Sequence, residues 1–241
     1  MLESATPLFL IGCPRSGTTF TARLLNSHPE ILMTNETAVF LLLDDIIRKS
    51  RTGIEAGILY GKDYHLLLGE LLETNYREMI QVFYEKIAHT ENRTRLAYWG
   101  EKHPHMTMCL DRVEHMFPDA RYIYLVRDPR DTAASIAKMR NVSFMEALNN
   151  WKVFSDLYEA FVPRLPADRL LLVRYETLVA NYEGEAARML QWLGVPTTPE
   201  VEEFLSNYKN ADAHSMATGK DFATESVGRW ASIIEEKQRA A

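Results

Sequence analysis

Cysteine is scarce in this sequence of 241 residues, a net positive charge is missing, and no apolar run approaches the length of a membrane span. The two cysteines, Cys13 and Cys109, do not suggest a disulfide scaffold and fit a reducing compartment. The net charge of -6 argues against a general binder of nucleic acid or of anionic membranes. The first residues also lack the basic segment that opens a signal peptide. These absences predict a cytoplasmic protein whose partners include neither nucleic acid nor a membrane.

The composition is otherwise that of an ordinary globular protein. Hydrophobic residues make up 46% of the chain and charged residues 25%. A chain of 241 residues fits one α/β domain better than two, and no repeat or linker divides it. We therefore expect a single domain over residues 1–241.

The most informative stretch lies near the N-terminus, where the apolar run Leu8 to Ile11 leads into the pattern Gly-x-x-x-x-Gly-Thr-Thr. A strand, a glycine-rich turn and a helix start make a phosphate site, because consecutive backbone N–H groups point at one anion. The spacing is that of the P-loop of nucleotide triphosphatases, except that Thr18 stands in the place of the lysine. Arg15, inside the loop, offers a positive fork instead. The missing lysine argues against an enzyme that uses Mg-ATP.

A second motif follows later in the chain. The run Tyr122–Val126 is rich in β-formers and predicts a buried strand. Arg127 and a turn come next, then Asp131 or Thr132 as the cap of a helix that carries Ser135 about one turn inside. An arginine fork and a serine hydroxyl are well suited to bind a phosphate. The two motifs in this order resemble the PAPS-dependent sulfotransferases, and most closely the branch with the tyrosylprotein and many bacterial sulfotransferases.

This resemblance implies a P-loop NTPase-like three-layer α/β sandwich, with a central parallel sheet flanked by helices. It also implies 3'-phosphoadenosine 5'-phosphosulfate (PAPS) as donor cosubstrate, with no metal required. The loop would hold the 5'-phosphosulfate, and Arg127 with Ser135 would hold the 3'-phosphate. Ser215 and Arg140 match family positions only loosely. The residues that the resemblance assigns to the donor are Arg15, Ser16, Gly17, Thr18, Thr19, Arg127, Ser135, Tyr175 and Arg229.

The resemblance further implies three catalytic residues, Glu36, Arg15 and Lys102. Glu36 matches the base of the tyrosylprotein branch, and Lys102 matches the lysine that contacts the oxygen bridging phosphate and sulfate. Taken alone, Glu36 is also typical of a helix N-terminus, where its charge favours the helix dipole. The implied reaction moves a sulfuryl group in line from PAPS to a hydroxyl acceptor and releases the product nucleotide PAP.

Several questions stay open at the level of sequence. Residues 39–95 predict a helical insertion on the acceptor side, and the resemblance implies that a segment at about 207–235 covers the nucleotide. The acceptor could be a small molecule, a carbohydrate, a peptide or a carrier-bound hydroxyl group. His103 and His105 could bind a metal, although their spacing without a nearby carboxylate or cysteine set is a weak signal, or one could line the acceptor pocket. The alternatives are a kinase or NTPase using Mg-ATP and a non-catalytic nucleotide-binding module, which would be favoured if Glu36 pointed away from the loop.

Overall fold

The apolar run near the N-terminus forms β1 (Thr6–Gly12), which is the central strand of a parallel sheet. The structure is a computed structural model that describes residues 2, 4–52, 64–210, 227–228 and 230–231. Within these residues the sheet has 5 strands in the order β2-β3-β1-β4-β5, and every neighbouring pair is parallel. The other strands are β2 (Ile31–Asn35), β3 (Tyr98–Lys102), β4 (Arg121–Val126) and β5 (Leu170–Arg174).

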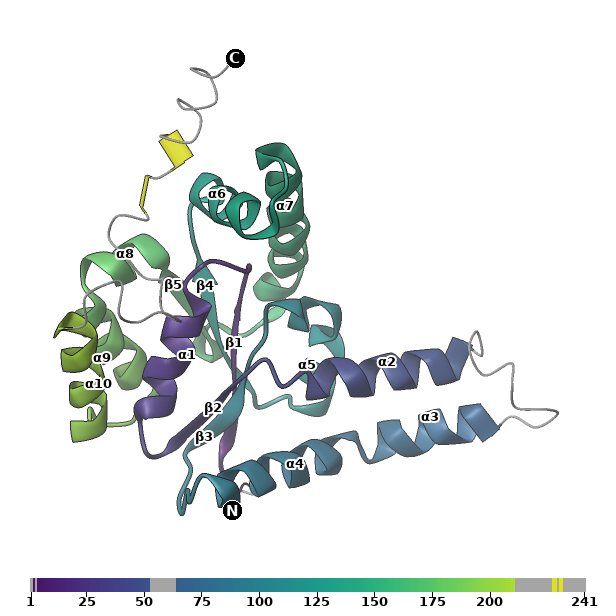
Figure 1. Cartoon of the computed structure of the whole chain (residues 1–241). Coiled ribbons are helices and arrows are strands. Elements are labelled where there is room, and N and C mark those ends of the chain that lie inside the picture. The colour runs from purple at the N-terminus through teal and green to yellow at the C-terminus, as the bar shows by residue number, and fades with distance from the viewer. Residues whose placement is uncertain (1, 3, 53–63, 211–226, 229, 232–241) are drawn as a thin grey trace.

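Helices cover both faces of this sheet, so the predicted three-layer sandwich is confirmed (Figure 1). Alternate residues of β1 enter two separate cores, because successive side chains of a strand point to opposite faces. Leu8 and Leu10 belong to one core, and Phe9 and Ile11 to the other. The first core is closed by α1 (Thr18–Ser27), α8 (Tyr175–Ala180), α9 (Tyr182–Leu193) and α10 (Pro199–Asn210). The second is closed by α4 (Tyr76–Thr90), α5 (Leu110–Met116) and α7 (Phe144–Phe161), with residues of α2 (Val39–Thr52), α6 (Pro129–Arg140) and the short 3-10 helices η1 (Pro104–Met108) and η2 (Val162–Arg164). A third 3-10 helix, η3 (Ala167–Arg169), precedes β5 and has no buried residue.

The strand order positions the site. From β1 the chain crosses first to β2 and β3 on one side and later to β4 and β5 on the other. Open α/β sheets bind ligands where the order reverses in this way, outside the carboxyl ends of the strands. The loops after β1, β2, β3 and β4 all reach that edge, and they carry the predicted site residues.

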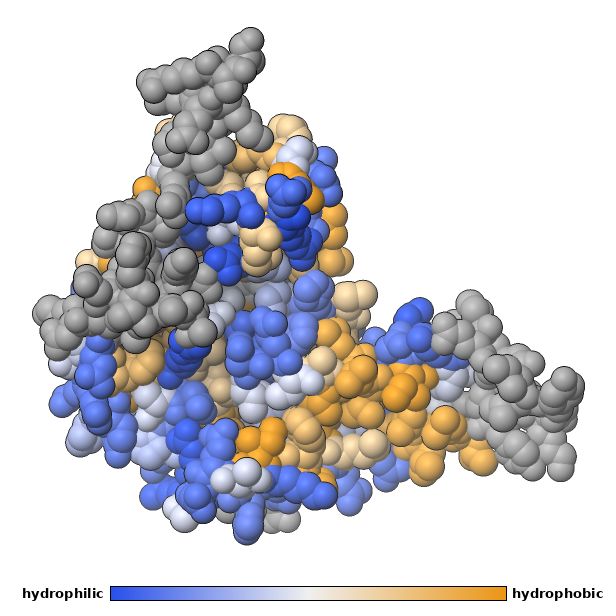
Figure 2. Space-filling view, viewed as in Figure 1, coloured by the Kyte–Doolittle hydropathy of each residue, from blue (hydrophilic) through white to orange (hydrophobic). Residues whose placement is uncertain are grey.

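Two antiparallel helices, α2 (Val39–Thr52) and α3 (Tyr64–Thr74), project from the body of the protein, and we call them the helical arm (Figure 1). Arg112 of α5 joins both of them, since its guanidinium donates to Asp44 (2.6 Å) and to Glu73 (2.9 Å). Apolar surface runs along the arm (Figure 2). The large apolar side chains that the arm exposes are Leu42, Ile46, Leu67, Leu68 and Leu71.

The spacing of Met108, Leu110, Val113 and Met116 predicts one amphipathic helix from Met106 to Phe117, and this prediction is wrong in its register. The structure divides the stretch into η1 and α5, and Met108 is 72% exposed. A 3-10 helix has three residues per turn, so the side chains of η1 follow a different stripe from those of α5.

A glycine directly after a periodic apolar run predicts a helix end, and Gly194 does end α9 in the left-handed conformation.

The cap of α6 (Pro129–Arg140) also differs from the prediction. Its N-cap is Asp128, whose side chain accepts the Arg130 N–H, rather than Asp131 or Thr132. Proline at the first helical position favours this earlier start, because its φ is already helical and it has no N–H to satisfy. Ser135 therefore lies further inside the helix than expected, and Asp131 is free of any capping role.

Candidate functional site

The loop between β1 and α1 depends on two glycines. A Cβ on Gly12 would lie 2.6 Å from the carbonyl oxygen of Leu125, and a Cβ on Gly17 would lie 2.6 Å from the ring of Tyr175. Gly17 also has a φ of 91°, which L side chains rarely adopt. Because α1 begins at Thr18, directly after Gly17, the unsatisfied N–H groups of its first turn open onto the loop. The backbone at Gly17, Thr18 and Thr19 therefore has the arrangement of an anion site, whereas the Ser16 N–H donates to the Cys13 carbonyl oxygen (3.2 Å).

Four of the predicted donor-binding side chains meet on one side of the loop. Arg127, at the end of β4, is 8% exposed and donates to the carbonyl oxygen of Arg15 (2.8 Å). The Arg15 side chain in turn donates to the hydroxyl of Ser135 (3.1 Å). The Arg127 guanidinium lies 4.3 Å from the centroid of the Tyr175 ring. Burial lowers the pKa of Arg127 from its high ordinary value, although the nearby carboxylates of Asp131 and Glu176 act in the opposite direction.

The catalytic candidates meet on the other side of the loop. Lys102 is 2% exposed, and its ammonium donates to Glu36 (2.5 Å) and to the Thr19 hydroxyl (3.3 Å). The contact follows from sheet register, because Asn35 of β2 is paired with Lys102 of β3. The Glu36 N–H continues that pairing by donating to the Lys102 carbonyl oxygen (2.9 Å). The Glu36 carboxylate thus points toward the loop. A non-catalytic module would have been favoured if it pointed away.

The charge state of Glu36 is set mainly by its neighbour. Partial burial on its own would raise the pKa of this carboxyl. The hydrogen bond and charge of Lys102, together with the more distant His103 and His105, outweigh burial and hold the pKa below its ordinary value of 4.5. Glu36 is therefore an ionised carboxylate at neutral pH, the form that can accept a proton.

A buried carboxylate that the sequence analysis missed supports this arrangement. Glu101 is 0% exposed and accepts the N–H of Ala38 (3.0 Å), just past Glu36. Glu36 and Ala38 both have positive φ, 58° and 62°, so this short segment turns sharply between β2 and α2. Burial raises the pKa of Glu101. An acidic residue inside an otherwise buried strand, next to the lysine, was the signal that could have revealed it.

His103 and His105 lie beside this pair. Their rings are 5.6 Å apart, His105 packs edge-on against Phe154 (5.3 Å), and burial lowers the pKa of His103. Among the described residues, no three His, Cys, Asp or Glu side chains are grouped as metal ligands would be. The backbone N–H of His105 donates to the His103 ring (3.1 Å), so this ring has a structural partner.

A cavity of about 320 Å³ opens on the α7 face of the same edge. It lies between the ends of β4 and β5 and helix α7, and reaches the loop through Cys13 and Ser16. Burial raises the pKa of the Cys13 thiol to about 12, which makes it a poor nucleophile. Trp151 is half-buried: it packs on the core and lines this cavity.

Three other candidate residues are not among the described side chains that meet at the loop between β1 and α1. Arg229 and Ser215 lie outside the described residues. Arg140 is exposed in the last turn of α6.

A family model described as the Sulfotransferase family matches residues 7–199. This chain belongs to the sulfotransferase family. Protein-tyrosine sulfotransferase A of Caenorhabditis elegans is 24% identical over 237 residues, which cover 92% of this chain and 56% of that protein. The protein-tyrosine sulfotransferase of Drosophila melanogaster is 27% identical over 250 residues, covering 94% of this chain and 47% of that protein. The chain thus spans about half the length of these curated relatives.

Solved structures agree on the fold of this member of the family. The sulfotransferase domain from the Synechococcus PCC 7002 olefin synthase matches with a TM-score of 0.63 and 22% identity, over 95% of this chain and 89% of that one. The family model confirms the family resemblance inferred from the two motifs. Within the described part of the chain, every helix is too short or too polar to span a bilayer.

Proposed function

We propose that this chain is a PAPS-dependent sulfotransferase, which moves a sulfuryl group from PAPS to a hydroxyl acceptor and releases 3'-phosphoadenosine 5'-phosphate (PAP). The observation that carries the proposal is the contact of Lys102 with both Glu36 and Thr19, because a base, a cation and the phosphate loop meet there. Membership of the family, and relatives named as tyrosine sulfotransferases, support the same activity.

The residues at the loop suit a donor that carries phosphates at both ends. Arg15 and the loop N–H groups would hold the 5'-phosphosulfate, and Arg127 with Ser135 would hold the 3'-phosphate, with Tyr175 packed under Arg127. The Ser16 hydroxyl is 1% exposed and has no hydrogen-bond partner within the described ranges. A buried polar atom of this kind suits a bound anion. The positive charge comes from side chains, so we propose that no metal is required.

Each catalytic residue would have a distinct task. Glu36 would take the proton of the acceptor hydroxyl while that oxygen bonds to sulfur. Lys102 would stabilise the charge that grows on the bridging oxygen as its bond to sulfur breaks, and Arg15 would stabilise the peripheral oxygens. The proton ends on Glu36, the sulfuryl group on the acceptor, and the electron pair of the broken bond on the phosphate of PAP. Such an in-line transfer needs positioning and positive charge more than a covalent enzyme intermediate.

The acceptor is proposed only as a class. The names of the tyrosine sulfotransferases support a hydroxyl group as the nucleophile. A small molecule, a carbohydrate, a peptide and a carrier-bound group all remain candidates. The cytoplasmic location, and the expectation of neither nucleic acid nor membrane as partner, stay predictions.

Titration calorimetry with PAP, beside Mg-ATP, tests the donor site. We expect PAP to bind and Mg-ATP to bind weakly or not at all. Arg127→Ala should raise the PAP Kd about tenfold or more, because a charged hydrogen-bond partner is lost, and Ser135→Ala about threefold. Lys152→Ala is the matched control, since this exposed lysine pairs with Asp156 and should leave the Kd unchanged. A preference for Mg-ATP, or no PAP binding by the wild type, would return the chain to the kinase alternative.

Glu36→Gln tests catalysis apart from binding. This change keeps the shape of the side chain and removes the base, so we expect kcat to fall about 10²–10⁴-fold. The PAP Kd should change less than about twofold, because Glu36 contacts Lys102 rather than the donor-binding arginines. The assay follows PAP release with PAPS and a panel of a phenol, a tyrosine peptide and a sugar. Equal rates for the two proteins would contradict the role of Glu36 and favour the non-catalytic module.

A further inference from the structure

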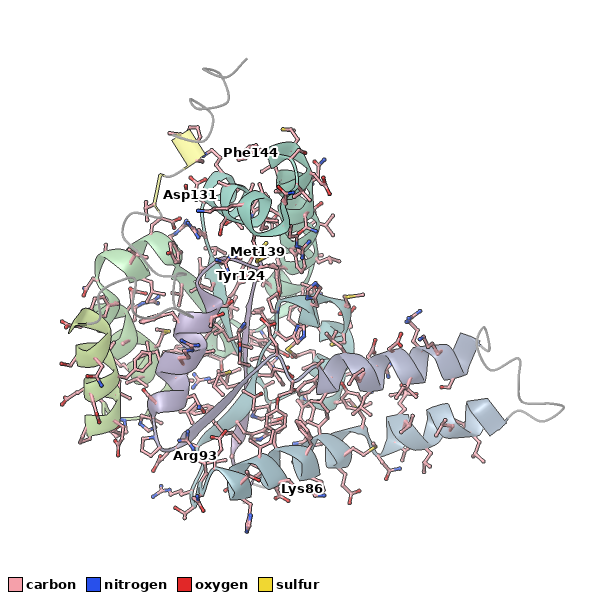
Figure 3. All side chains as sticks on the ribbon, viewed as in Figure 1. Lys86, Arg93, Tyr124, Asp131, Met139 and Phe144 are labelled. Carbon is pink, nitrogen blue, oxygen red and sulfur yellow. The ribbon has the colours of Figure 1, made fainter. Side chains whose placement is uncertain are left out.

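The start of α6 binds a segment from the far C-terminal part of the chain. Asp131 is 3% exposed and uses both of its carboxylate oxygens as acceptors. Oδ2 accepts the backbone N–H of Gly228 (2.7 Å), and Oδ1 accepts that of Trp230 (3.0 Å). Figure 3 shows Asp131 at the start of α6, facing the C-terminal segment drawn in yellow. We call Val227, Gly228, Trp230 and Ala231 the tail segment.

The Trp230 ring makes a second contact with the same helix start. It stacks with the Arg130 guanidinium, 4.2 Å from the ring centroid. Arg130 is itself held by two hydrogen bonds to Asp128 (3.0 and 2.6 Å). The Asp128 N–H donates to Glu176 (2.8 Å), which directly follows Tyr175. The tail segment, the start of α6 and the start of α8 therefore form one hydrogen-bonded network.

This network surrounds the residues assigned to the 3'-phosphate. Arg127 comes just before α6 and stacks on Tyr175 at the start of α8, while Ser135 lies within α6. Asp131 cannot itself be a phosphate ligand, because its negative charge would repel the anion. The charge of Asp131 near Arg127 opposes the binding of an anion, so a favourable effect of Asp131 on nucleotide binding must act through the backbone that it holds.

We propose that Asp131 is a positioning residue for the nucleotide: it fixes the tail segment against the start of α6 and so keeps the 3'-phosphate end of the site in its binding geometry. This inference rests on the proposed function. Arg127 directly precedes the N-cap of α6 and Ser135 lies within the helix, so the position of the helix start sets the position of both side chains. Loss of the Asp131 contact should therefore weaken the binding of a nucleotide with a 3'-phosphate more than that of one without it.

The test compares PAP with AMP, which lacks the 3'-phosphate, on the full chain. Asp131→Asn replaces one acceptor oxygen by an amide nitrogen, which cannot accept a hydrogen bond. Gly228→Ala strains the tail backbone, whose φ is 76°, without a clash, since no described atom lies within 4 Å of the added Cβ. Each change should raise the PAP Kd about tenfold and the AMP Kd less than about twofold. Because both variants break the same contact, the PAP Kd of the double variant should be no higher than that of the single variant that binds PAP more weakly.

Asp119→Asn is the matched control, because this aspartate is exposed and lies at the opposite end of β4, so neither Kd should change. Amide hydrogen exchange without nucleotide reads the contact directly, and exchange at Gly228 should be faster in Asp131→Asn. Equal losses for PAP and AMP, additive losses in the double variant, or unchanged exchange would overturn the positioning role. A wild type that does not bind PAP would overturn the proposed function itself, whereas PAP binding unaffected by Asp131→Asn would overturn this inference alone.

Discussion

The nucleotide edge of the sheet and the helical arm are held together in opposite ways. At the edge, buried polar groups such as Arg127, Lys102 and Asp131 contact one another and the backbone. On the arm, Leu42 and Leu71 are mostly exposed, and the ion pairs of Asp45 with Arg48 and Lys49 lie at the surface. Buried polar contacts are costly to break, whereas exposed apolar side chains contribute little to stability. We therefore expect substitutions at the edge to affect both stability and nucleotide binding, and substitutions of exposed residues on the arm to affect neither.

The largest expected effect comes from Gly17→Ala, which attacks the edge at its tightest point. The added Cβ would meet the Tyr175 ring at 2.6 Å and force a residue with a side chain into a φ of 91°. We expect the free energy of unfolding to fall by about 2–4 kcal/mol, from backbone strain and overpacking together. The PAP Kd should rise by about tenfold or more, because the loop N–H groups move with the ring. Chemical denaturation and calorimetry measure the two quantities.

Gly194→Ala separates the two causes. Gly194 has a φ of 73°, but no described atom lies within 4 Å of the Cβ position. Only the strain remains, so we expect a loss of about 1 kcal/mol in stability and no change in the PAP Kd. If the two alanine variants behaved alike, the close approach of Tyr175 to the loop would have no role in binding.

The edge was also the part that sequence could predict. Strand, glycine turn and helix start follow one another locally, so Gly12, Gly17 and Arg127 could be assigned without knowing which strands pair. The roles of Glu36 and Lys102 could be assigned only from the resemblance, because their contact depends on strand order, which no local pattern encodes. Gly228 and Trp230 lie 97 and 99 positions after Asp131, so no local signal predicts their contacts with it.

On the arm, the sequence predicted helices but not their surroundings. The periodic leucines of residues 39–74 could have entered a core, yet in the described part Leu42 and Leu71 remain 62% and 58% exposed. Helical periodicity identifies one face of a helix, and only the tertiary structure decides what covers it. On the acceptor side, sequence reasoning could therefore assign no residue beyond Glu36, Lys102 and one of His103 and His105.

The pH dependence of Glu36 sharpens the comparison, since it depends on one contact at the edge. The folded-state pKa of this carboxyl is lowered by Lys102, so the pair stabilises the protein above pH 4.5 and loses that effect as pH falls through the lowered pKa. Lys102→Met should move the carboxyl pKa upward, because burial then acts without the ammonium. Carbon-13 NMR titration of the Glu36 carboxyl measures this directly. An unchanged titration would mean that the ion pair is not maintained in solution.

The smallest effect is expected on the arm, from Leu42→Ser. Leu42 is 62% exposed, so its truncation should change the free energy of unfolding by less than about 0.5 kcal/mol and leave the PAP Kd within about twofold. Phe40→Ala, two residues earlier in the same helix, should have the opposite outcome. Phe40 is 0% exposed and packs among Phe9, Tyr84 and Phe117, so its truncation should lower the free energy of unfolding by about 3–5 kcal/mol. A large loss from Leu42→Ser would mean that this side chain is covered in solution. The contrast between a buried polar edge that binds the nucleotide and an arm with exposed apolar side chains would then be wrong.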